Sequence, residues 1–493
     1  MLELFQRAQA SSDRTAIVSD GQSFTYQTLL DRSAAVATTL LAGSDDLREA
    51  RIAFLVPPSF EYVACQWGIW RAGGIAVPLC TAHPLPSLRY VLEDTQANTL
   101  IVHENYEALL EATAREMDVR LIRLADLLVK DALAPLPIIA PARRAQILYT
   151  SGTTSLPKGV VATHANIQSQ ITTLVTAWEW QADDKILNIL PLHHVHGIIN
   201  VLSCALWSGA CCEFLPKFDA ATVWEKLSNN SLTRFMAVPT IYYKLISYWE
   251  RQPRREQAWL SANARQLNLM VSGSAALPIP TLERWREITE HTLLERYGMT
   301  EIGMGLSNSF RGERRPGHVG LPLPGVALRL VDSKGDSITD ANVSGEIQIK
   351  GPSVFLEYWQ KPEATKAAFT EDDWFRTGDI AEKNEGMYRI LGRDSVDIIK
   401  SGGYKISALE IEAELLRHKL VDECAVVGIP DEEWGEIIVA AIVSSRKLDF
   451  RRLSNWLRER IPAYRLPRRW RQLETLPRNT LGKVTKNELK KLF

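Results

Sequence analysis

The chain has 493 residues and a net charge of −1 at neutral pH, with 46% hydrophobic and 23% charged residues. This length is too great for one hydrophobic core and predicts two or more domains, while the near-zero charge excludes a global attraction to nucleic acid or to a membrane surface. The six cysteines show no CxxC pair and no metal-ligand spacing, which is typical of small core residues in a reducing compartment.

The first part of the chain alternates short apolar runs with helical patterns. Residues 1–18 contain no apolar signal core, so we expect a cytoplasmic protein. Residues 51–56 and 74–79 are expected to be strands on either side of a helix over 61–73. This βαβ pattern predicts parallel strands covered by helices. Further buried strands are expected at 99–103, 145–148, 185–190, 234–239 and 267–273.

The segment 149–159, YTSGTTSLPKG, follows the strand expected at 145–148. It combines hydroxyl side chains and glycines with Lys158, and these groups together suit a polyphosphate. It is not a Walker A loop, because GxxxxGK[ST] cannot be laid over it. The alternative is a polar surface turn, since clusters of Gly, Ser and Thr are also ordinary loops.

The most apolar stretch, residues 197–212, contains Asn200 and is too short to span a bilayer, so we expect a buried helix and strand there. From residue 326 the pattern changes. Segments 326–332, 345–351 and 387–400 alternate apolar and polar residues, which predicts a small antiparallel sheet or barrel.

The last hundred residues are expected to form a separate small domain that begins near residues 393–397. Helices are expected at 408–418 and 450–461, and strands at 423–430 and 436–444. Residues 451–493 carry 13 Lys and Arg against 3 Asp and Glu. This excess of positive charge indicates either a solvated helix face with a frayed tail or a binding surface for a highly phosphorylated partner molecule.

Six further segments become informative when they are taken together and in chain order. They are PLHHVHG (191–197), VSGSAALP (271–278), LERYGMTE (294–301, expected as a short loop), WFRTGD (374–379), GRDSVDIIKSGGYKIS (392–407) and PRNTLGK (477–483). With these segments the chain resembles, over essentially its whole length, the adenylate-forming superfamily of acyl-CoA synthetases, luciferases and peptide-synthetase adenylation domains. Within it the sequence is most similar to the malonyl-CoA synthetases. One departure is Ser155, which stands where the family has a third glycine.

The resemblance implies an α/β fold and a two-step ligase reaction. The large N-terminal part (1–393) would contain two doubly wound α/β subdomains and a small β-barrel-like subdomain, followed by a small mobile α+β domain (394–493). Malonate would be activated by ATP and Mg²⁺ and then transferred to CoA. We therefore expect only small-molecule partners, with no nucleic acid and no membrane, in a monomer or a weak homodimer.

The resemblance also implies the ATP site. Thr300 would contact the α-phosphate, Glu301 would ligate Mg²⁺, Tyr297 would stack on adenine, Asp379 would accept from the ribose hydroxyls, and Arg393 would contact the nucleotide. For each there is a structural alternative, such as a helix-terminal carboxylate at Glu301, a turn residue at Asp379 or a surface ion pair at Arg393. The remaining ATP residues implied are Thr150, Ser151, Gly152, Thr153, Thr154, Lys158, Ser274, Ala275, Ala276 and Gly298.

The malonate assignment depends mainly on Arg296, whose guanidinium would pair with the distal carboxylate. The alternative is that Arg296 pairs with a neighbouring acid such as Glu295. The other residues implied to line the acid pocket are His193, His196, Ser272, Thr240 and Met304. A metal site at the histidines is disfavoured, because adjacent histidines on a strand or loop are expected to point apart.

Lys483 would be the adenylation lysine, and its alternative is one more lysine of the basic tail. Because it belongs to the small domain, that domain would close on ATP and then rotate about a hinge near Asp394–Ser395 to admit CoA. The CoA tunnel would be lined by Lys400, Gly402, Gly403 and Tyr404.

Three other functions stay open at this point. One is a ligase for methylmalonate or for short- or medium-chain monocarboxylates, and another is an adenylating enzyme that loads a carrier protein. The third is an inactive nucleotide-binding or scaffold protein, which the presence of Lys483, Glu301 and Asp379 disfavours.

Overall fold

A computed structural model describes residues 1–127, 135–150, 156–229, 231–394, 396–402, 404–478 and 484–493. Several predicted residues lie outside these ranges, and the structure does not place them. They are Ser151, Gly152, Thr153, Thr154, Ser155, Ser395, Gly403 and Lys483.

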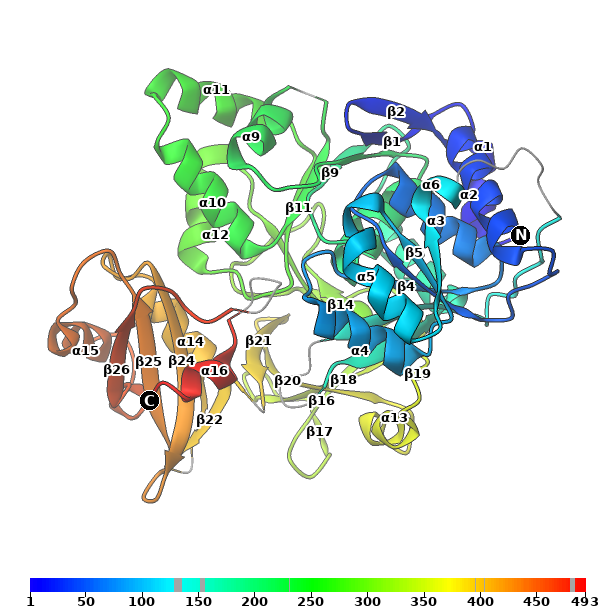
Figure 1. Cartoon of the computed structure of the whole chain (residues 1–493). Helices are drawn as coiled ribbons and strands as arrows, with labels where there is room; N and C mark the ends of the chain where they lie inside the picture. Colours follow the sequence, from blue (N-terminus) through cyan, green and yellow to red (C-terminus); the bar gives the residue numbers. More distant parts are fainter. Residues whose placement is uncertain (128–134, 151–155, 230, 395, 403, 479–483) are drawn as a thin grey trace.

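A seven-stranded sheet forms one half of the large N-terminal part (Figure 1). Its central strands β3 and β4 are parallel and joined by α3, as the βαβ pattern predicts. In sheet order its strands are β19 (Glu357–Tyr358), β8 (Lys158–Thr163), β7 (Arg144–Thr150), β4 (Ile75–Pro78), β3 (Arg51–Leu55), β5 (Thr99–Val102) and β6 (Arg120–Arg123). The helices of this half are α2 (Tyr26–Leu41), α3 (Phe60–Arg71), α4 (Leu85–Thr95), α5 (Glu104–Glu116) and α6 (Leu124–Leu127).

A nine-stranded sheet forms the other half. In sheet order its strands are β15 (Leu321–Pro322), β14 (Gly303–Ser307), β13 (Leu294–Met299), β12 (Leu269–Ser272), β11 (Arg234–Ala237), β9 (Lys185–Asn188), β10 (Cys211–Phe214), β1 (Thr15–Ser19) and β2 (Gln22–Thr25). From β13 to β1 neighbouring strands are parallel. The helices are α1 (Glu3–Ala10), α7 (His164–Ala177), α8 (Cys204–Trp207), α9 (Ala220–Ser228), α10 (Pro239–Glu250), α11 (Arg254–Ala264) and α12 (Ile279–Thr289).

Two segments of this half differ from expectation. Residues 294–301 are not a short loop. Strand β13 runs to Met299 and pairs antiparallel with β14 across a turn. The apolar stretch is a buried helix followed by β10, as predicted, but its first part is the π-helix η1 (His196–Ser203), which the sequence pattern did not reveal.

A third, antiparallel sheet follows the order β17 (Ser337–Ile338), β16 (Ala327–Val331), β18 (Gly345–Lys350), β20 (Phe375–Asn384) and β21 (Met387–Arg393), with α13 (Pro362–Ala368) before β20. The alternating stretch 387–400, expected in one small sheet, is divided. Strand β21 belongs to this sheet, whereas β22 (Ile398–Ser401) begins the next one. The chain therefore leaves the third sheet immediately after Arg393.

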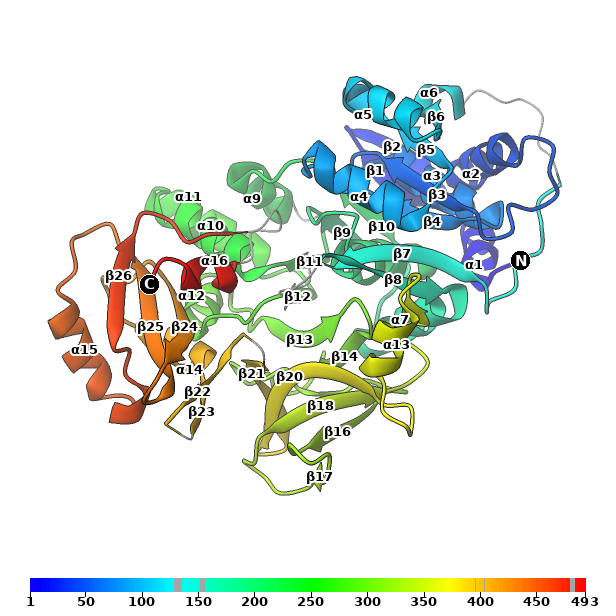
Figure 2. The ribbon, with the colours of Figure 1, turned by 60° about the horizontal axis from the view of Figure 1, so that its bottom comes forward.

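The fourth sheet contains β22, β23 (Tyr404–Ser407), β24 (Glu423–Asp431), β25 (Gly435–Val443) and β26 (Arg469–Leu473). Its helices are α14 (Ala408–Leu415), α15 (Phe450–Arg458), α16 (Lys486–Lys490) and the 3₁₀ turn η2 (Ala463–Arg465). Figure 2 shows this orange and red unit at one end of the molecule, beyond β21. The α/β fold class predicted from the sequence is confirmed.

The apolar side chains pack between these sheets and helices. Large cores include the buried indoles of Trp67, Trp70, Trp224 and Trp285. All six cysteines are free thiols, and four are buried, as expected of core residues. In the part of the chain that is described, no helix combines the length and the apolar character needed to cross a bilayer.

Candidate active site

The predicted substrate residues follow the carboxyl ends of three parallel strands. Strand β9 leads to His193 and His196, β11 leads to Thr240, and β12 ends at Ser272 and leads to Ser274. Because parallel strands end at the same edge of a sheet, these residues gather at one edge, where open α/β sheets bind their ligands. Ser272 is buried and its hydroxyl has no hydrogen-bond partner within the described ranges, whereas Thr240, Ser274, Ala275 and Ala276 are exposed.

Tyr297, Asp379 and Arg393 converge between β13 and the β20–β21 hairpin. The Tyr297 hydroxyl donates to Asp379 Oδ2 at 2.6 Å, and Arg393 Nε donates to Oδ1 at 3.0 Å. Asp379 and Arg393 are also register partners across the hairpin. Burial, reinforced by the charge of Asp379, raises the pKa of Tyr297 well above its usual value, so the phenol stays a donor. These contacts hold the Asp379 carboxylate in one orientation.

Glu301 and the described ends of the predicted phosphate loop meet through Tyr358. The Tyr358 hydroxyl donates to Glu301 Oε1 at 3.1 Å, and Lys158 Nζ lies 4.9 Å from the centre of the Tyr358 ring. Lys158 pairs with Thr150 across the β7–β8 hairpin. The sequence does not predict this contact, because a lone tyrosine before a tryptophan, as at Tyr358, carries no signal for it.

The donor set around Glu301 suits a hard cation. Its side chain is buried, and burial raises the pKa of the carboxyl above its ordinary value. A buried carboxylate that accepts a hydrogen bond from one phenol gains from a cation that accepts oxygen ligands, as Mg²⁺ does. The residues present therefore fit the magnesium ion that the sequence predicts at this position.

The turn between β13 and β14 presents Thr300 beside Glu301. At Gly298, a Cβ atom would lie 2.1 Å from the carbonyl oxygen of Gly303 and 2.5 Å from Met304 Cε, so only glycine fits. Met304 itself is buried, with 3% of its surface exposed. The hairpin thus fixes Thr300, Glu301 and Met304 on one rigid support.

Arg296 is a buried cation without an acidic partner in the described structure. It is 5% exposed, and its Nη2 donates to Ser274 Oγ at 3.4 Å, while Nε has no hydrogen-bond partner there. Ser274 Oγ also lies 3.1 Å from His196 Nδ1. Burial lowers the pKa of Arg296 to about 10, so the side chain is still charged at neutral pH. An unpaired buried charge is costly, and an anionic ligand would remove that cost.

The alternative in which Arg296 pairs with Glu295 is wrong. Successive residues of strand β13 point to opposite faces, and Glu295 Oε1 accepts from the Gly317 N–H at 2.8 Å on the other face. Burial raises the pKa of Glu295 to about 8, which favours its uncharged form at neutral pH. The Arg296 guanidinium therefore stays available at the ligand edge.

The histidines contribute uncharged rings. Burial lowers the pKa of His193 to about 2 and of His194 to about 4, and it lowers that of His196 well below its usual value. The expectation that adjacent histidines on a strand or loop point apart is wrong for His193 and His194, whose ring centres lie 4.1 Å apart where the chain turns before η1. No group of three His, Cys, Asp or Glu side chains arranged to hold a metal occurs among the residues described.

The described residues of the predicted CoA set gather on the β22–β23 hairpin. Gly402 has a φ of 57°, and a Cβ there would lie 2.9 Å from the Trp434 ring. Tyr404 is 56% exposed and stacks on Tyr464 with ring centres 4.5 Å apart. Lys400 Nζ lies 3.3 Å from Asp394 Oδ2, next to the expected hinge.

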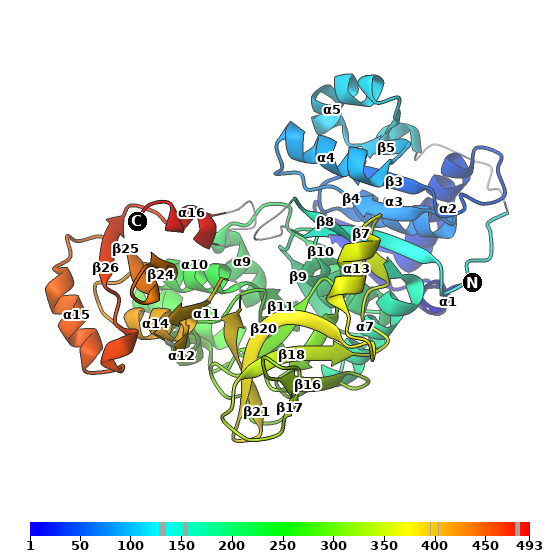
Figure 3. The same ribbon diagram turned by 90° about the horizontal axis from the view of Figure 1, so that it is seen from below.

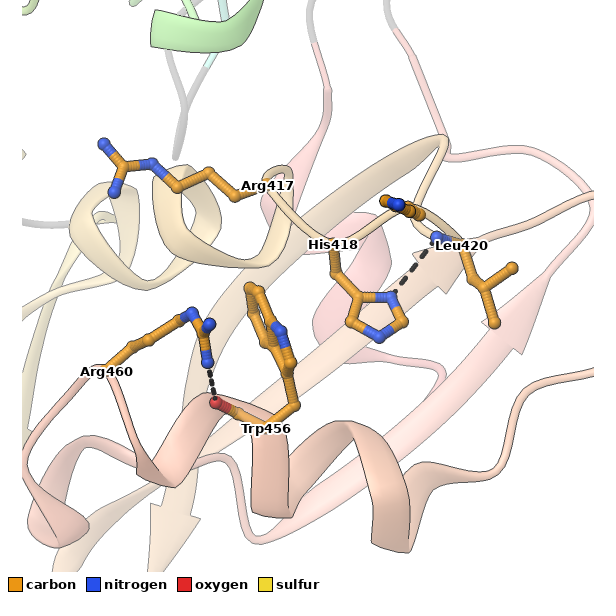
Figure 4. Close-up of a pocket in the computed structure, with 6 residues that line it drawn as sticks. Arg417, His418, Leu420, Trp456 and Arg460 are labelled. Atoms are coloured by element: carbon orange, nitrogen blue, oxygen red, sulfur yellow. Dashed lines mark hydrogen bonds between the residues drawn. The ribbon is translucent and has the colours of Figure 1, made fainter.

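A separate cavity of about 610 Å³ lies between the end of α14 and α15 (Figure 4). The Trp456 ring lies between Arg460, whose Cζ is 4.0 Å from the indole centre, and His418, at 4.9 Å between ring centres. Its described lining contains none of the predicted site residues. The cavity is therefore distinct from the edge where the ATP and acid residues gather.

Comparisons with known proteins agree with this geometry. Residues 4–359 match the AMP-binding enzyme family, and residues 410–483 match the AMP-binding enzyme C-terminal domain. A mitochondrial malonate–CoA ligase of Xenopus laevis is 44% identical over 99% of this chain and 91% of its own length. The crystal structure of ATP-bound MatB from Rhodopseudomonas palustris superposes with a TM-score of 0.92 at 32% identity, covering 100% of this chain and 98% of that one. The o-succinylbenzoate-CoA synthetase of Bacillus subtilis, bound to ATP and magnesium, has a TM-score of 0.86 at 28% identity and 99% coverage of both chains.

Proposed function

Because this chain belongs to the family of AMP-binding enzymes, we propose that it is an ATP-dependent malonate:CoA ligase. In the first half-reaction a malonate carboxylate attacks the α-phosphorus of ATP, which gives malonyl-AMP and releases pyrophosphate. In the second, the CoA thiol attacks the mixed anhydride, which gives malonyl-CoA and releases AMP. The observation that carries the choice of acid is the buried Arg296, which has no acidic partner at the ligand edge of the described sheet.

The charge balance explains why a dicarboxylate fits. One carboxylate of malonate must reach the α-phosphorus, so the other is left to be recognised. A guanidinium can bind that second carboxylate through two parallel hydrogen bonds. Losing one partner of such a desolvated pair costs about 2–5 kcal/mol, which is enough to exclude monocarboxylates. The uncharged rings of His193 and His196 bound the pocket without adding a competing positive charge.

The ATP site follows from the same arrangement. Asp379, held by Tyr297 and Arg393, would accept hydrogen bonds from the ribose hydroxyls. Thr300 would donate to the α-phosphate, and Lys158 would contribute positive charge to the outer phosphates. Glu301 would hold Mg²⁺, which supplies neutralisation of phosphate charge when bound. Positioning and charge neutralisation are the main requirements of this chemistry, so no protein nucleophile is needed.

The remaining ATP and acid residues surround these groups. The outer phosphates would be held by Thr150, Ser151, Gly152, Thr153 and Thr154. The adenine slot would be lined by Ser274, Ala275 and Ala276, with Tyr297 stacked on the base, and Gly298 would also contact ATP. The acid would be held by Ser272, Thr240 and Met304. In this arrangement small residues face the adenine, while Thr240 and Met304 limit the length of the acid.

We further propose that residues 1–393 and 394–493 act as two domains that change their relative orientation between the half-reactions. Lys483 would bridge the malonate carboxylate and the α-phosphate in the first orientation. In the second, Lys400, Gly402, Gly403 and Tyr404 would line the path of CoA. The proposed state is a monomer or a weak homodimer, and a cytoplasmic location agrees with the six free thiols.

The first experiment is AMP release with ATP, Mg²⁺ and CoA against malonate, methylmalonate, succinate, acetate and octanoate. A preference for malonate, lost in Arg296→Ala with the ATP KM unchanged, would support the proposal. Arg311→Ala, which removes an exposed arginine paired with Glu179, is the matched control and should leave the preference unchanged. A preference for acetate or octanoate would keep the ligase chemistry and reject malonate. Malonyl-CoA formation by Arg296→Ala at near wild-type kcat/KM would reject the role of Arg296.

A further inference from the structure

Tyr358 lies between two oppositely charged side chains of the proposed ATP site and contacts both of them. Its hydroxyl donates to Glu301 Oε1 at 3.1 Å, and Lys158 Nζ lies over its ring, 4.9 Å from the ring centre. The tyrosine itself is buried, with 8% of its surface exposed. The face of an aromatic ring attracts a cation, most strongly where water is excluded. One side chain therefore holds the proposed magnesium carboxylate at its polar end and the proposed phosphate lysine on its ring.

Residues 355–359 join the two halves of this site through their backbone. Strand β19 pairs antiparallel with β8, and the Trp359 N–H donates to the Gly159 carbonyl at 2.8 Å. The Phe355 N–H donates to the Glu301 carbonyl at 2.7 Å. In Figure 3 the helix α13, which follows β19, lies in front of the β7–β8 hairpin. The tyrosine is thus fixed by main-chain contacts to both elements that carry its two charged partners.

Without this phenol the two charged groups would attract each other directly. No ion pair joins Lys158 to Glu301 in the part of the chain that the structure describes, although both contact the same side chain. Opposite charges attract more strongly where water is excluded than in bulk water. A direct pair would occupy the ammonium that the outer phosphates need and the carboxylate that Mg²⁺ needs. Tyr358 satisfies each charge separately, because its hydroxyl and its ring face are different parts of one rigid group.

We propose that Tyr358 is a positioning residue that keeps Lys158 and Glu301 apart, so that the lysine stays available to phosphate and the carboxylate to Mg²⁺. This inference rests on the proposed roles of Lys158 and Glu301 in the ATP site. Both contacts of the tyrosine are weak enough to be exchanged for contacts with the ligand, since a phenol is an uncharged donor and a ring face carries no net charge. A direct ion pair would have to be broken before the ligand could bind, and this would lower the affinity.

The test is the affinity of the full-length protein for ATP, measured by titration calorimetry with and without Mg²⁺. Tyr358→Leu removes both contacts, so the affinity for ATP without Mg²⁺ should fall about tenfold, the loss expected when one charged donor no longer reaches the phosphates. The gain in affinity on adding Mg²⁺ should shrink as well, because the lysine then holds the carboxylate. Tyr358→Phe should bind ATP without Mg²⁺ within about threefold of wild type, because a phenylalanine ring also attracts a cation. Tyr26→Phe, which removes a buried phenol that donates to the Ala210 carbonyl at 2.7 Å, is the matched control and should leave both affinities unchanged.

A second substitution distinguishes positioning from a general structural defect. In a Glu301→Gln background, Tyr358→Leu should change the affinity for ATP without Mg²⁺ by less than about twofold, because an uncharged amide does not trap the lysine. A tenfold loss in both backgrounds would overturn the inference, since a structural defect does not depend on the charge of Glu301. No loss in Tyr358→Leu would also overturn it. Tyr358→Met, whose flexible side chain fills irregular space, is tested beside the leucine variant by thermal unfolding and calorimetry, and the same dependence on Glu301 is expected.

The proposed function and this inference fail in different ways. If wild-type protein binds ATP but does not turn over malonate, only the malonate assignment fails, because the calorimetric test contains no acid. If Lys158→Ala leaves the affinity for ATP unchanged, the proposed role of Lys158 fails and this inference fails with it. If Lys158→Ala weakens ATP binding but the effect of Tyr358→Leu does not depend on Glu301, only the positioning role of Tyr358 fails.

Discussion

Replacing Gly273 by alanine should displace Arg296 without disturbing the sheet. A Cβ atom at this position would lie 2.4 Å from Cζ and 2.5 Å from Nε of Arg296. Two carbon atoms pack best at about 3.5–4.0 Å, so the guanidinium must retreat by about 1 Å or more. The Gly273 φ is outside the left-handed region that disfavours side chains, so the backbone accepts alanine. The strain therefore falls on the flexible end of one side chain.

A retreat of this size is large compared with the tolerance of the proposed ion pair. Charged N–H···O contacts are about 2.7–2.9 Å long, and an added 1 Å takes them beyond hydrogen-bond range. We expect Gly273→Ala to lower kcat/KM for malonate about 100-fold, which corresponds to about 2.7 kcal/mol. The KM for ATP and the residual rate with acetate should change less than about threefold, because neither ligand uses the guanidinium.

The assay is steady-state AMP release with malonate and with acetate, together with thermal unfolding of each variant. The control is the double variant Gly273→Ala/Arg296→Ala, which should be no worse with malonate than Arg296→Ala alone, since both changes act on one interaction. Unchanged kcat/KM for malonate in Gly273→Ala would refute the reasoning. Additive losses of kcat/KM in the double variant would show that alanine at position 273 lowers activity by a means other than displacing Arg296.

Three further outcomes follow from the buried polar groups. Burial raises the pKa of the Glu295 carboxyl to about 8, so between about pH 4.5 and 8 this group binds more protons in the folded chain than in the unfolded chain. The free energy of unfolding therefore falls as the pH rises through this window. Glu295→Gln should therefore raise Tm at pH 9 and leave it nearly unchanged at pH 4, and a shift that is the same at both pH values would contradict this. Asp184→Asn breaks a 2.7 Å ion pair with Arg234 between side chains that are 2% exposed, and should destabilise the protein by about 3–5 kcal/mol in urea unfolding. A loss below about 1 kcal/mol would mean that the remaining charge is solvated. Tyr297→Phe removes the 2.6 Å hydrogen bond to Asp379 and should raise the KM for ATP about tenfold, while the KM for malonate stays unchanged. Equal increases of both KM values would show that Tyr297 does not act through the ATP site alone.

The sequence predicted the elements whose patterns are local. Strands β3 and β4 and the helix between them carry their own signals in apolar runs and helical spacing, and they form as expected. The segment 294–299 gave no such signal, because it contains charged and small residues and becomes a strand by pairing with β12 and β14. Propensity does not contain this information, since pairing depends on residues distant in the chain.

The site was predictable in its residue types but not in its contacts. The resemblance to the adenylate-forming superfamily identified Tyr297, Asp379 and Glu301 as candidates. In the structure the Tyr297 hydroxyl donates to Asp379, and Glu301 accepts from Tyr358. The opposite orientations of Glu295 and Arg296 follow from the alternation of a strand that the sequence did not predict. The ion pair between Lys486 Nζ and Asp397 Oδ1, at 2.7 Å, joins residues almost ninety positions apart, and no local pattern encodes such a contact.

The π-helix η1 offers a way in which the acid specificity of this site can change during evolution. A π turn contains one residue more than an α turn, whereas each residue of an α-helix rotates the chain by about 100°. Here the Cys204 N–H reaches back to the Ile199 carbonyl, five residues earlier. Loss of one residue within 196–203 would restore an α turn and rotate His196 away from Ser274. A single deletion in this segment, which has no charged side chains, could therefore change the acid preference. Related enzymes that differ by one residue here would have different side chains lining the acid pocket, although every charged group of the site is retained.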